Sequence, residues 1–143
     1  MKKFELPIKI ESVIYRKKEN RVEFLALKRS LEDGGFWQPI TGTLESNESL
    51  EECLLREAQE EIGVSLENVI SVSGLLHSFT WEKKNIGVMN EYIFAVEIKL
   101  DSVVELSSEH TEFKWCTQEE AELLFSMENN KIGLRKTIEY LNS

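Results

Sequence analysis

Three glutamates on one predicted helix have the spacing of a metal-binding cluster. Glu57, Glu60 and Glu61 stand at positions i, i+3 and i+4, so at ~100° per residue they project within about 100° of one another. Apolar residues of the same segment overlap this arc, whereas a helix selected only for packing would carry charges on the opposite face. A divalent cation would relieve the repulsion and the desolvation penalty of such crowded carboxylates. The cluster therefore predicts a metal site, with a solvated acidic helix face as the alternative.

The composition is that of an acidic globular protein. The chain has 143 residues, which fits one domain with a sizeable core, and we expect a single domain over residues 1–143. The formal net charge of −9 disfavours non-specific binding to DNA or RNA, so we expect no nucleic-acid partner. A phosphate-bearing substrate would need local positive charge, which a bound metal can supply.

No segment of the sequence predicts a membrane span or an export signal. No apolar run approaches the ~20 residues needed to cross a bilayer, so we expect no membrane partner. Residues Met1–Pro7 lack the apolar centre of a signal peptide. Cys53 and Cys116 have neither Cys-x-x-Cys nor zinc spacing and are expected to be buried thiols. These observations predict a cytoplasmic protein.

The predicted elements are strands, one helix, further strands and then two helices. The clearest element is the helix Leu50–Ile62, where Ser49 and Glu52 have capping-box spacing and Gly63 supplies a C-terminal stop. Strands are predicted at Ile8–Tyr15, Val22–Leu27, Val69–Phe79, Ile86–Leu100 and Glu112–Cys116, short extended pieces within Phe36–Leu44, and turns at Arg16–Asn20 and Leu31–Gly35. Two further helices are predicted at Gln118–Phe125 and Lys131–Leu141. This order predicts an α/β fold in which helices cover a mixed β-sheet.

The acidic helix belongs to a longer motif that begins in the preceding loop. Residues 42–64 fit the pattern G-x5-E-x7-R-E-U-x-E-E-x-G-U, where U is a bulky or aliphatic residue. The fixed positions are filled by Gly42, Glu48, Arg56, Glu57, Glu60, Glu61 and Gly63, and the U positions by Ala58 and Val64. The motif resembles the Nudix box, the signature of the Nudix hydrolases. The element order is similar to their α/β/α sandwich.

The resemblance implies a metal-dependent hydrolase and assigns roles by position. Nudix hydrolases cleave a nucleoside diphosphate linked to another group, with Mg²⁺ or Mn²⁺ as cofactor. The implied metal ligands are the carbonyl of Gly42 and the carboxylates of Glu57, Glu60 and Glu61. Hard carboxylate oxygens suit these hard cations, which neutralise the diphosphate and activate the attacking water. Arg56 is expected to pair with Glu48 and brace the loop, with a surface pair to Glu52 as the alternative.

The residue that activates water is either Glu57, inside the motif, or Glu109, outside it. Some Nudix enzymes use a glutamate of the box and others use one from a distant loop. Glu109 lies in the segment Ser107–Trp115, and the resemblance implies that it also binds metal. Glu112 is a further candidate for the base, whereas His110 has no partner at nucleophile or zinc spacing and is expected to be structural or exposed.

Segments outside the motif resemble the bacterial dihydroneopterin triphosphate diphosphatases, a subfamily of the Nudix hydrolases. The resemblance lies in Leu27–Ser30, Phe36–Gly42 and Glu109–Trp115, with Ile40-Thr41-Gly42 where many other members have Pro-Gly-Gly. Leu75–Asn90 departs from that subfamily, and we expect a substrate-selecting loop there.

Basic and aromatic side chains are candidates for contacts to a flat, phosphate-bearing substrate. Arg29 stands where a strand runs into a loop and would approach a terminal phosphate, with a surface arginine as the alternative. Candidates to stack on a heterocycle are Phe36, Trp37, Phe79 and Trp81, with core packing as the alternative for each. We assign substrate binding to Arg29, Phe36 and Trp37, and Asn90 or Glu91 is a further candidate to read the donors of a base edge.

The predicted reaction is hydrolysis of a phosphoanhydride bond in a nucleoside or pterin triphosphate, which releases pyrophosphate and a monophosphate. One alternative is hydrolysis of another nucleoside diphosphate derivative, such as ADP-ribose or a dinucleoside polyphosphate. Another is a regulator that binds a nucleotide without cleaving it, which the complete set of motif glutamates disfavours. The predicted partner is a small polyphosphate, and the sequence makes no prediction of oligomeric state.

Overall fold

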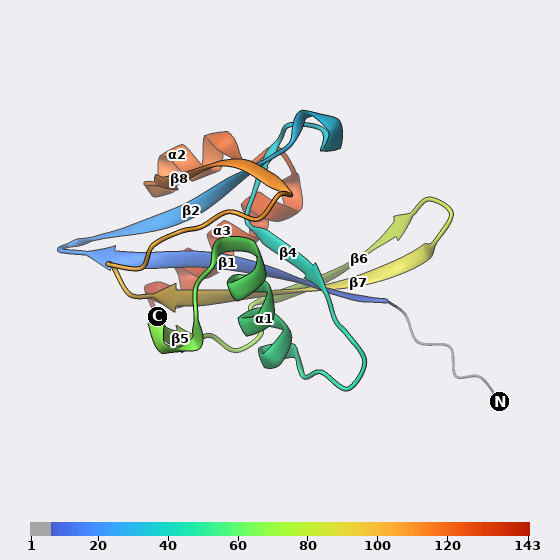
Figure 1. The fold of residues 1–143 in the computed structure, drawn as a ribbon, viewed down its shortest axis with the longest axis horizontal. Helices are drawn as coiled ribbons and strands as arrows, with labels where there is room; N and C mark the ends of the chain where they lie inside the picture. The colour runs from blue at the N-terminus through green and yellow to red at the C-terminus, as the bar shows by residue number, and fades with distance from the viewer. Residues whose placement is uncertain (1–6) are drawn as a thin grey trace.

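The computed structural model describes residues 7–143, and a mixed sheet with helices on both faces forms its centre (Figure 1). This arrangement confirms the predicted fold class. The segment searched for a signal peptide lies outside the described residues except for Pro7. Within the described part of the chain, no helix is long and apolar enough to cross a membrane.

The sheet contains eight strands, and β1 lies at its centre. The strands are β1 Ile8–Lys18, β2 Arg21–Arg29, β3 Trp37–Gln38, β4 Ile40–Thr43, β5 Val69–Val72, β6 His77–Lys83, β7 Gly87–Ile98 and β8 His110–Cys116. Their order is β3-β2-β1-β7-β5, with β4 paired to β1, β6 to β7 and β8 to β2. β1 and β7 are parallel, and the other strand pairs are antiparallel. Because β4 pairs with the N-terminal half of β1 and β2 with its C-terminal half, the sheet divides along β1.

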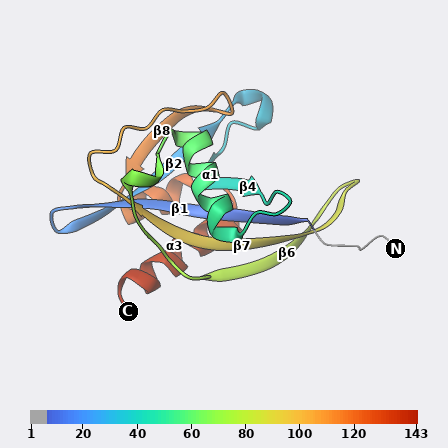
Figure 2. The same ribbon diagram turned by 60° about the horizontal axis from the view of Figure 1, so that its bottom comes forward.

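Helix α1, Leu50–Ile62, covers one face of the sheet, and α2, Gln118–Leu124, and α3, Glu128–Leu141, cover the other (Figure 2). Successive side chains of β1 point to opposite faces of the sheet, so β1 contributes core residues to both faces. Ile10 packs with Leu54 of α1, whereas Val13 belongs to the same buried cluster as Leu134 of α3. Charged residues of β1 at odd-numbered positions therefore point toward α3.

Helix α1 has the bounds that the sequence predicts. The Ser49 side chain accepts a hydrogen bond from the backbone N–H of Glu52, and the Glu52 carboxylate accepts one from the backbone N–H of Ser49, which completes the capping box. Gly63 ends the helix in the left-handed region at φ 68°, which favours glycine. The buried residues of α1 include Glu57 and Glu61, so the packed face carries two of the three predicted metal ligands.

Several predicted boundaries are wrong. Val69–Phe79 is not one strand, because the chain leaves the edge of β7 at Ser73 and returns to it at Leu76. The Ser73 hydroxyl accepts a hydrogen bond from the Ala95 N–H, which replaces a backbone partner and forms the break between β5 and β6. β1 extends to Lys18 instead of ending at Tyr15, so the turn after it is shorter than predicted. β8 begins at His110 instead of Glu112, and α3 begins at Glu128 instead of Lys131. Cys53 and Cys116 are buried free thiols, as expected.

Candidate active site

The packing of α1 against β4 positions the acidic motif. Glu57 and Glu61 are each 7% exposed, whereas the Glu60 side chain is 53% exposed. The Glu57 carboxyl group lies directly against Gly42 of β4, because a Cβ atom added to Gly42 would come within 2.2 Å of Glu57 Oε2. Gly42 therefore belongs to the motif for a steric reason, since any side chain would displace Glu57.

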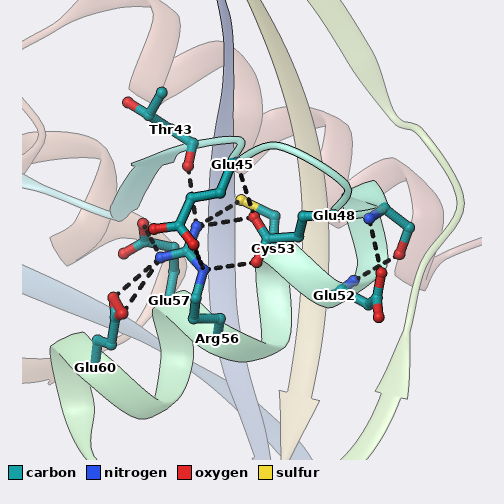
Figure 3. A network of polar contacts seen from close by, with 9 residues as sticks. Thr43, Glu45, Glu48, Glu52, Cys53, Arg56, Glu57 and Glu60 are labelled. Carbon is teal, nitrogen blue, oxygen red and sulfur yellow. Dashed lines mark hydrogen bonds and ion pairs between the residues drawn. The ribbon is translucent and has the colours of Figure 1, made fainter.

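Arg56 holds the loop that precedes α1 (Figure 3). Its Nε donates to Glu48 Oε2 at 2.6 Å, a terminal nitrogen donates to Glu48 Oε1 at 3.0 Å, and the same nitrogen donates to the Thr43 carbonyl at 3.0 Å. The bond from Arg56 lowers the pKa of Glu48 to about 2. The pairing of Arg56 with Glu48 that the sequence predicts is present, and Glu52 takes part in the helix cap instead.

The remaining guanidinium nitrogen of Arg56 reaches the acidic cluster. It donates to Glu57 Oε2 at 3.2 Å and to Glu60 Oε2 at 3.0 Å. Burial raises the pKa of Glu57, and the charges of Glu60 and Glu109 raise it further. Arg56 thus connects the loop to two predicted metal ligands.

The turn before β8 brings Glu109 to the same cluster. The Ser107 hydroxyl donates to Glu61 Oε1 at 2.5 Å, and the exposed Glu109 follows two residues later. Burial and the neighbouring Glu109 carboxyl raise the pKa of Glu61 to about 7, whereas the pKa of Glu109 is lowered by the hydrogen bond from Glu61. A proton held between these carboxyls lowers their mutual repulsion.

His110 lies under this pair. Its ring is buried, its Nδ1 lies 3.6 Å from Glu61 Oε1, and its Nε2 lies 3.3 Å from Gln38 Nε2. Burial lowers the pKa of His110, which favours the neutral imidazole. The sequence predicts a structural or exposed histidine, and this position against Glu61 supports the wall of the acidic cluster.

The residues of the cluster fit a hard divalent cation in their chemistry. All side-chain donors are carboxylate oxygens, the type that Mg²⁺ and Mn²⁺ prefer. Burial raises the pKa values of Glu57 and Glu61 and neighbouring carboxylates raise them further, so a bound cation would favour their ionised forms. Within residues 7–143 no three acidic, histidine or cysteine side chains are grouped closely enough to hold an ion directly. Glu60 turns to Arg56, and Glu61 turns to Ser107.

A cavity of about 530 Å³ is lined by residues of β1, β4, β6 and β7 together with Asn129 and Asn130 of α3. Its lining residues are Lys9, Arg29, Asp33, Phe36, Gln38, Thr41, Phe79, Trp81, Lys83, Glu91, Met127, Asn129 and Asn130. Thr41 precedes Gly42 in β4, and the charges of Arg29 and Lys9 act on Glu109 and Glu57, respectively. Glu57, Glu60, Glu61 and Glu109 do not line the cavity, but its cations lie close enough to act electrostatically on two of them.

The cavity contains some of the residues predicted to bind substrate. Arg29 and Phe36 line it, together with Phe79 and Trp81 of β6. Trp37 does not belong to the lining but packs against the buried cluster beneath α2 and α3. The segment Leu75–Asn90, expected to be a substrate-selecting loop, belongs to a β-hairpin formed by β6 and β7. Its first strand, β6, contributes Phe79 and Trp81 to the cavity wall.

The sequence names Glu91 of β7 as a candidate to read base-edge donors, with Asn90 as the alternative, but it does not predict a role for Lys9 of β1. Lys9 and Glu91 are register partners across the parallel pair, and Glu11 follows on the same face of β1. The sequence does contain a signal for these residues, because charged side chains at inward positions of an otherwise buried strand are unusual and indicate a functional site.

Comparisons with known proteins agree with this architecture. The NUDIX domain family matches residues 9–140. The dihydroneopterin triphosphate diphosphatase of Haemophilus influenzae is 32% identical over 134 residues, which cover 87% of this chain and 82% of that protein. The asymmetrical bis(5'-nucleosyl)-tetraphosphatase of Caenorhabditis elegans is 30% identical over 109 residues, 76% of this chain and 78% of that one.

A solved structure extends the similarity to the whole fold. The crystal structure of a binary complex of the Caenorhabditis elegans Ap4A hydrolase superposes with a TM-score of 0.81 and 25% identity. The superposition covers 96% of this chain and 98% of that one. Together with the complete motif at residues 42–64, these matches show that the chain belongs to the Nudix hydrolase family.

Proposed function

We propose that the protein hydrolyses a phosphoanhydride bond in a nucleoside or pterin triphosphate and releases pyrophosphate and a monophosphate. The observation that supports the proposal is a cavity that combines aromatic walls with the cations Lys9 and Arg29, whose charges act on Glu57 and Glu109 of the acidic cluster. A heterocycle would stack against the aromatic side chains, while Lys9 and Arg29 would contact phosphate oxygens. The name of the Haemophilus influenzae relative supports a triphosphate substrate.

The predicted residues of the motif and Glu109 would each have a role in this reaction. Mg²⁺ or Mn²⁺, which Nudix hydrolases generally use, would be held by the Gly42 carbonyl and by Glu57, Glu60, Glu61 and Glu109. When bound, the ion would neutralise the polyphosphate and lower the pKa of the attacking water. Arg56 and Glu48 hold the loop so that Gly42 stays against Glu57. Glu57 and Glu109 are the two candidates for the group that accepts the proton from water.

The test removes two carboxylates without changing side-chain shape. We expect Glu60→Gln combined with Glu61→Gln to lower kcat/KM by about a thousandfold with Mg²⁺, because several kcal/mol of transition-state stabilisation is lost. Pyrophosphate release from a panel of nucleoside and pterin triphosphates is the measurement. The control combines Glu51→Gln with Glu67→Gln, which removes two exposed carboxylates away from the cluster. Unchanged hydrolysis in the first double variant would exclude the proposed role of the cluster.

A second candidate substrate is a dinucleoside polyphosphate. The Caenorhabditis elegans tetraphosphatase is 30% identical to this chain, and the Ap4A hydrolase structure superposes over nearly all of it. The products separate the two candidates, because an asymmetrically cleaved dinucleoside tetraphosphate yields a nucleoside triphosphate and a monophosphate and no pyrophosphate.

A further inference from the structure

The part of the cavity nearest α3 contains a buried carboxyl group. Glu91 of β7 lines the cavity and is 6% exposed. The Trp81 indole N–H donates to Glu91 Oε1 at 3.0 Å and fixes its orientation. Within residues 7–143, no lysine, arginine or histidine forms an ion pair with Glu91. Its register partner Lys9 lowers the pKa of Glu91 through its charge but makes no direct ion pair, so the second oxygen of Glu91 has no direct cation partner among the described residues.

Behind Glu91 lie Glu11 of β1 and Asn130 of α3. Asn130 Nδ2 donates to Glu11 Oε1 at 2.9 Å, which leaves Asn130 Oδ1 buried and without a partner among the described residues. Glu11 is fully buried beneath Gly133 of α3, where an added Cβ would collide with Glu11 Oε2. Burial and the nearby Glu91 raise the pKa of Glu11 well above its usual value, which favours the protonated form of Glu11. Burial also raises the pKa of Glu91, whereas the hydrogen bond from Trp81 and the charge of Lys9 lower it.

Such a wall matches a flat ring whose edge carries N–H donors. Phe36, Phe79 and Trp81 supply faces for stacking, and Glu91 supplies a carboxylate beside them. The 2-amino-4-oxo ring shared by guanine and pterin presents a ring N–H next to an exocyclic amino group, and a carboxylate accepts from both. Adenine presents a ring nitrogen acceptor at the corresponding position, which a carboxylate repels.

We infer that Glu91 determines specificity by accepting hydrogen bonds from the ring N–H and amino group of a 2-amino-4-oxo heterocycle. This inference rests on the proposed function for the identity of the cavity as the substrate site. Asn130 is a positioning residue that holds Glu11 behind Glu91. The N–H edge of the ligand would then pair the carboxylate oxygen of Glu91 that no cation contacts directly.

Binding of monophosphates tests the inference separately from catalysis. The probes are GMP, IMP, AMP and neopterin monophosphate, titrated into the full chain in EDTA and followed by tryptophan fluorescence and calorimetry. None of them contains a phosphoanhydride bond, so the result does not depend on metal or turnover. We expect GMP and neopterin monophosphate to bind roughly ten- to hundredfold more tightly than AMP, with IMP weaker than GMP because it lacks the amino group. Whichever of GMP and neopterin monophosphate binds more tightly identifies the ring that the cavity prefers.

Two variants of the same strand assign the preference to one residue. Glu91→Gln replaces an acceptor oxygen with an amide donor, and we expect it to abolish the preference for GMP over AMP. Glu97→Gln removes a buried carboxylate six residues further along β7, outside the cavity, and should retain the preference. If Glu91→Gln does not fold, Trp81→Phe keeps an aromatic ring but removes the N–H that orients Glu91, and should reduce the preference.

Equal affinity for GMP and AMP in the wild type would overturn the inference, as would a Glu91→Gln variant that keeps the preference. Neither result would contradict the proposed hydrolysis, which is tested separately by the variant that combines Glu60→Gln with Glu61→Gln. Conversely, a selective binder that hydrolyses no triphosphate would retain the ring assignment and exclude the enzymatic proposal.

Discussion

Two groups of acidic side chains lie on opposite faces of the sheet and meet very different surroundings. The helix cluster, Glu57, Glu60, Glu61 and Glu109, lies on the α1 side and includes two exposed members and the cation Arg56. The sheet pair, Glu11 and Glu91, lies on the α3 side and is held by the neutral donors of Trp81 and Asn130. The same functional group therefore suits exchangeable cations in one place and an uncharged N–H edge in the other.

The difference depends on how each group is packed. Glu57 is pressed against backbone at Gly42 but remains at the edge of the sheet beside water. Glu11 is enclosed by β1, β7 and α3, where desolvation dominates its ionisation. Substitutions in the helix cluster should therefore change activity and the response to metal, whereas substitutions in the sheet pair should change stability and the preference for a ring.

The largest effect is expected where the helix cluster touches the backbone. Gly42→Ala would place a methyl group on the Glu57 carboxyl, which must move by an ångström or more. We expect kcat/KM to fall by about a hundredfold or more, because misplacement of that size disrupts a catalytic arrangement. Steady-state kinetics with a triphosphate substrate measures this.

The matched control for Gly42→Ala is Gly74→Ala. No atom lies within 4 Å of a Cβ added at Gly74. Equal activity losses in the two glycine variants would show that backbone stiffness, and not the position of Glu57, is responsible.

A smaller effect is expected from Arg56→Lys. Lysine keeps the positive charge but loses the two-nitrogen contact with Glu48 and one or more of the bonds to Thr43 and Glu60. We expect the free energy of unfolding to fall by about 1.5–3 kcal/mol and kcat/KM by about tenfold. Urea unfolding and kinetics measure both.

Arg135→Lys is the comparison for that variant. Arg135 also bonds two glutamates, Glu122 and Glu128, but on an exposed surface where such pairs contribute little. A loss of stability in Arg135→Lys as large as that in Arg56→Lys would contradict the importance of the half-buried loop contact.

The helix cluster was predictable from sequence because its geometry is local. Positions i, i+3 and i+4 fix the relative directions of three carboxylates once the helix is recognised, and the capping box and Gly63 mark its ends. The mixed sheet followed from the order of elements. Strand ends were less predictable, because a single hydroxyl at Ser73 interrupts a segment rich in β-branched residues.

The sheet pair was not predictable from local pattern. Glu11 and Glu91 become neighbours only through the parallel register of β1 and β7, which neither segment determines alone. The same limit applies to the aromatic residues: Trp37 and Trp81 are alike as sequence candidates, yet Trp37 packs into the core and Trp81 lines the cavity. Register and strand order decide such placements.

The last and smallest effect concerns the stability of the sheet pair as a function of pH. The pKa of Glu11 is raised in the folded state above its ordinary value of 4.5, so folding favours the protonated form. Wild-type stability should therefore fall as pH rises from about 4.5 through the raised pKa, because the unfolded chain releases this proton first. Glu11→Gln keeps an oxygen to accept from Asn130 and has no proton to lose. The free energy of unfolding of Glu11→Gln should exceed that of the wild type clearly at pH 8 and only slightly at pH 5, as measured by urea unfolding.

The control is Glu97→Gln, which removes a carboxylate 3.8 Å from Lys17 and should show no such gain. A Glu11→Gln variant that is less stable than wild type at pH 8 would mean that Glu11 is ionised in the folded protein, and the contrast between the two acidic groups would fail.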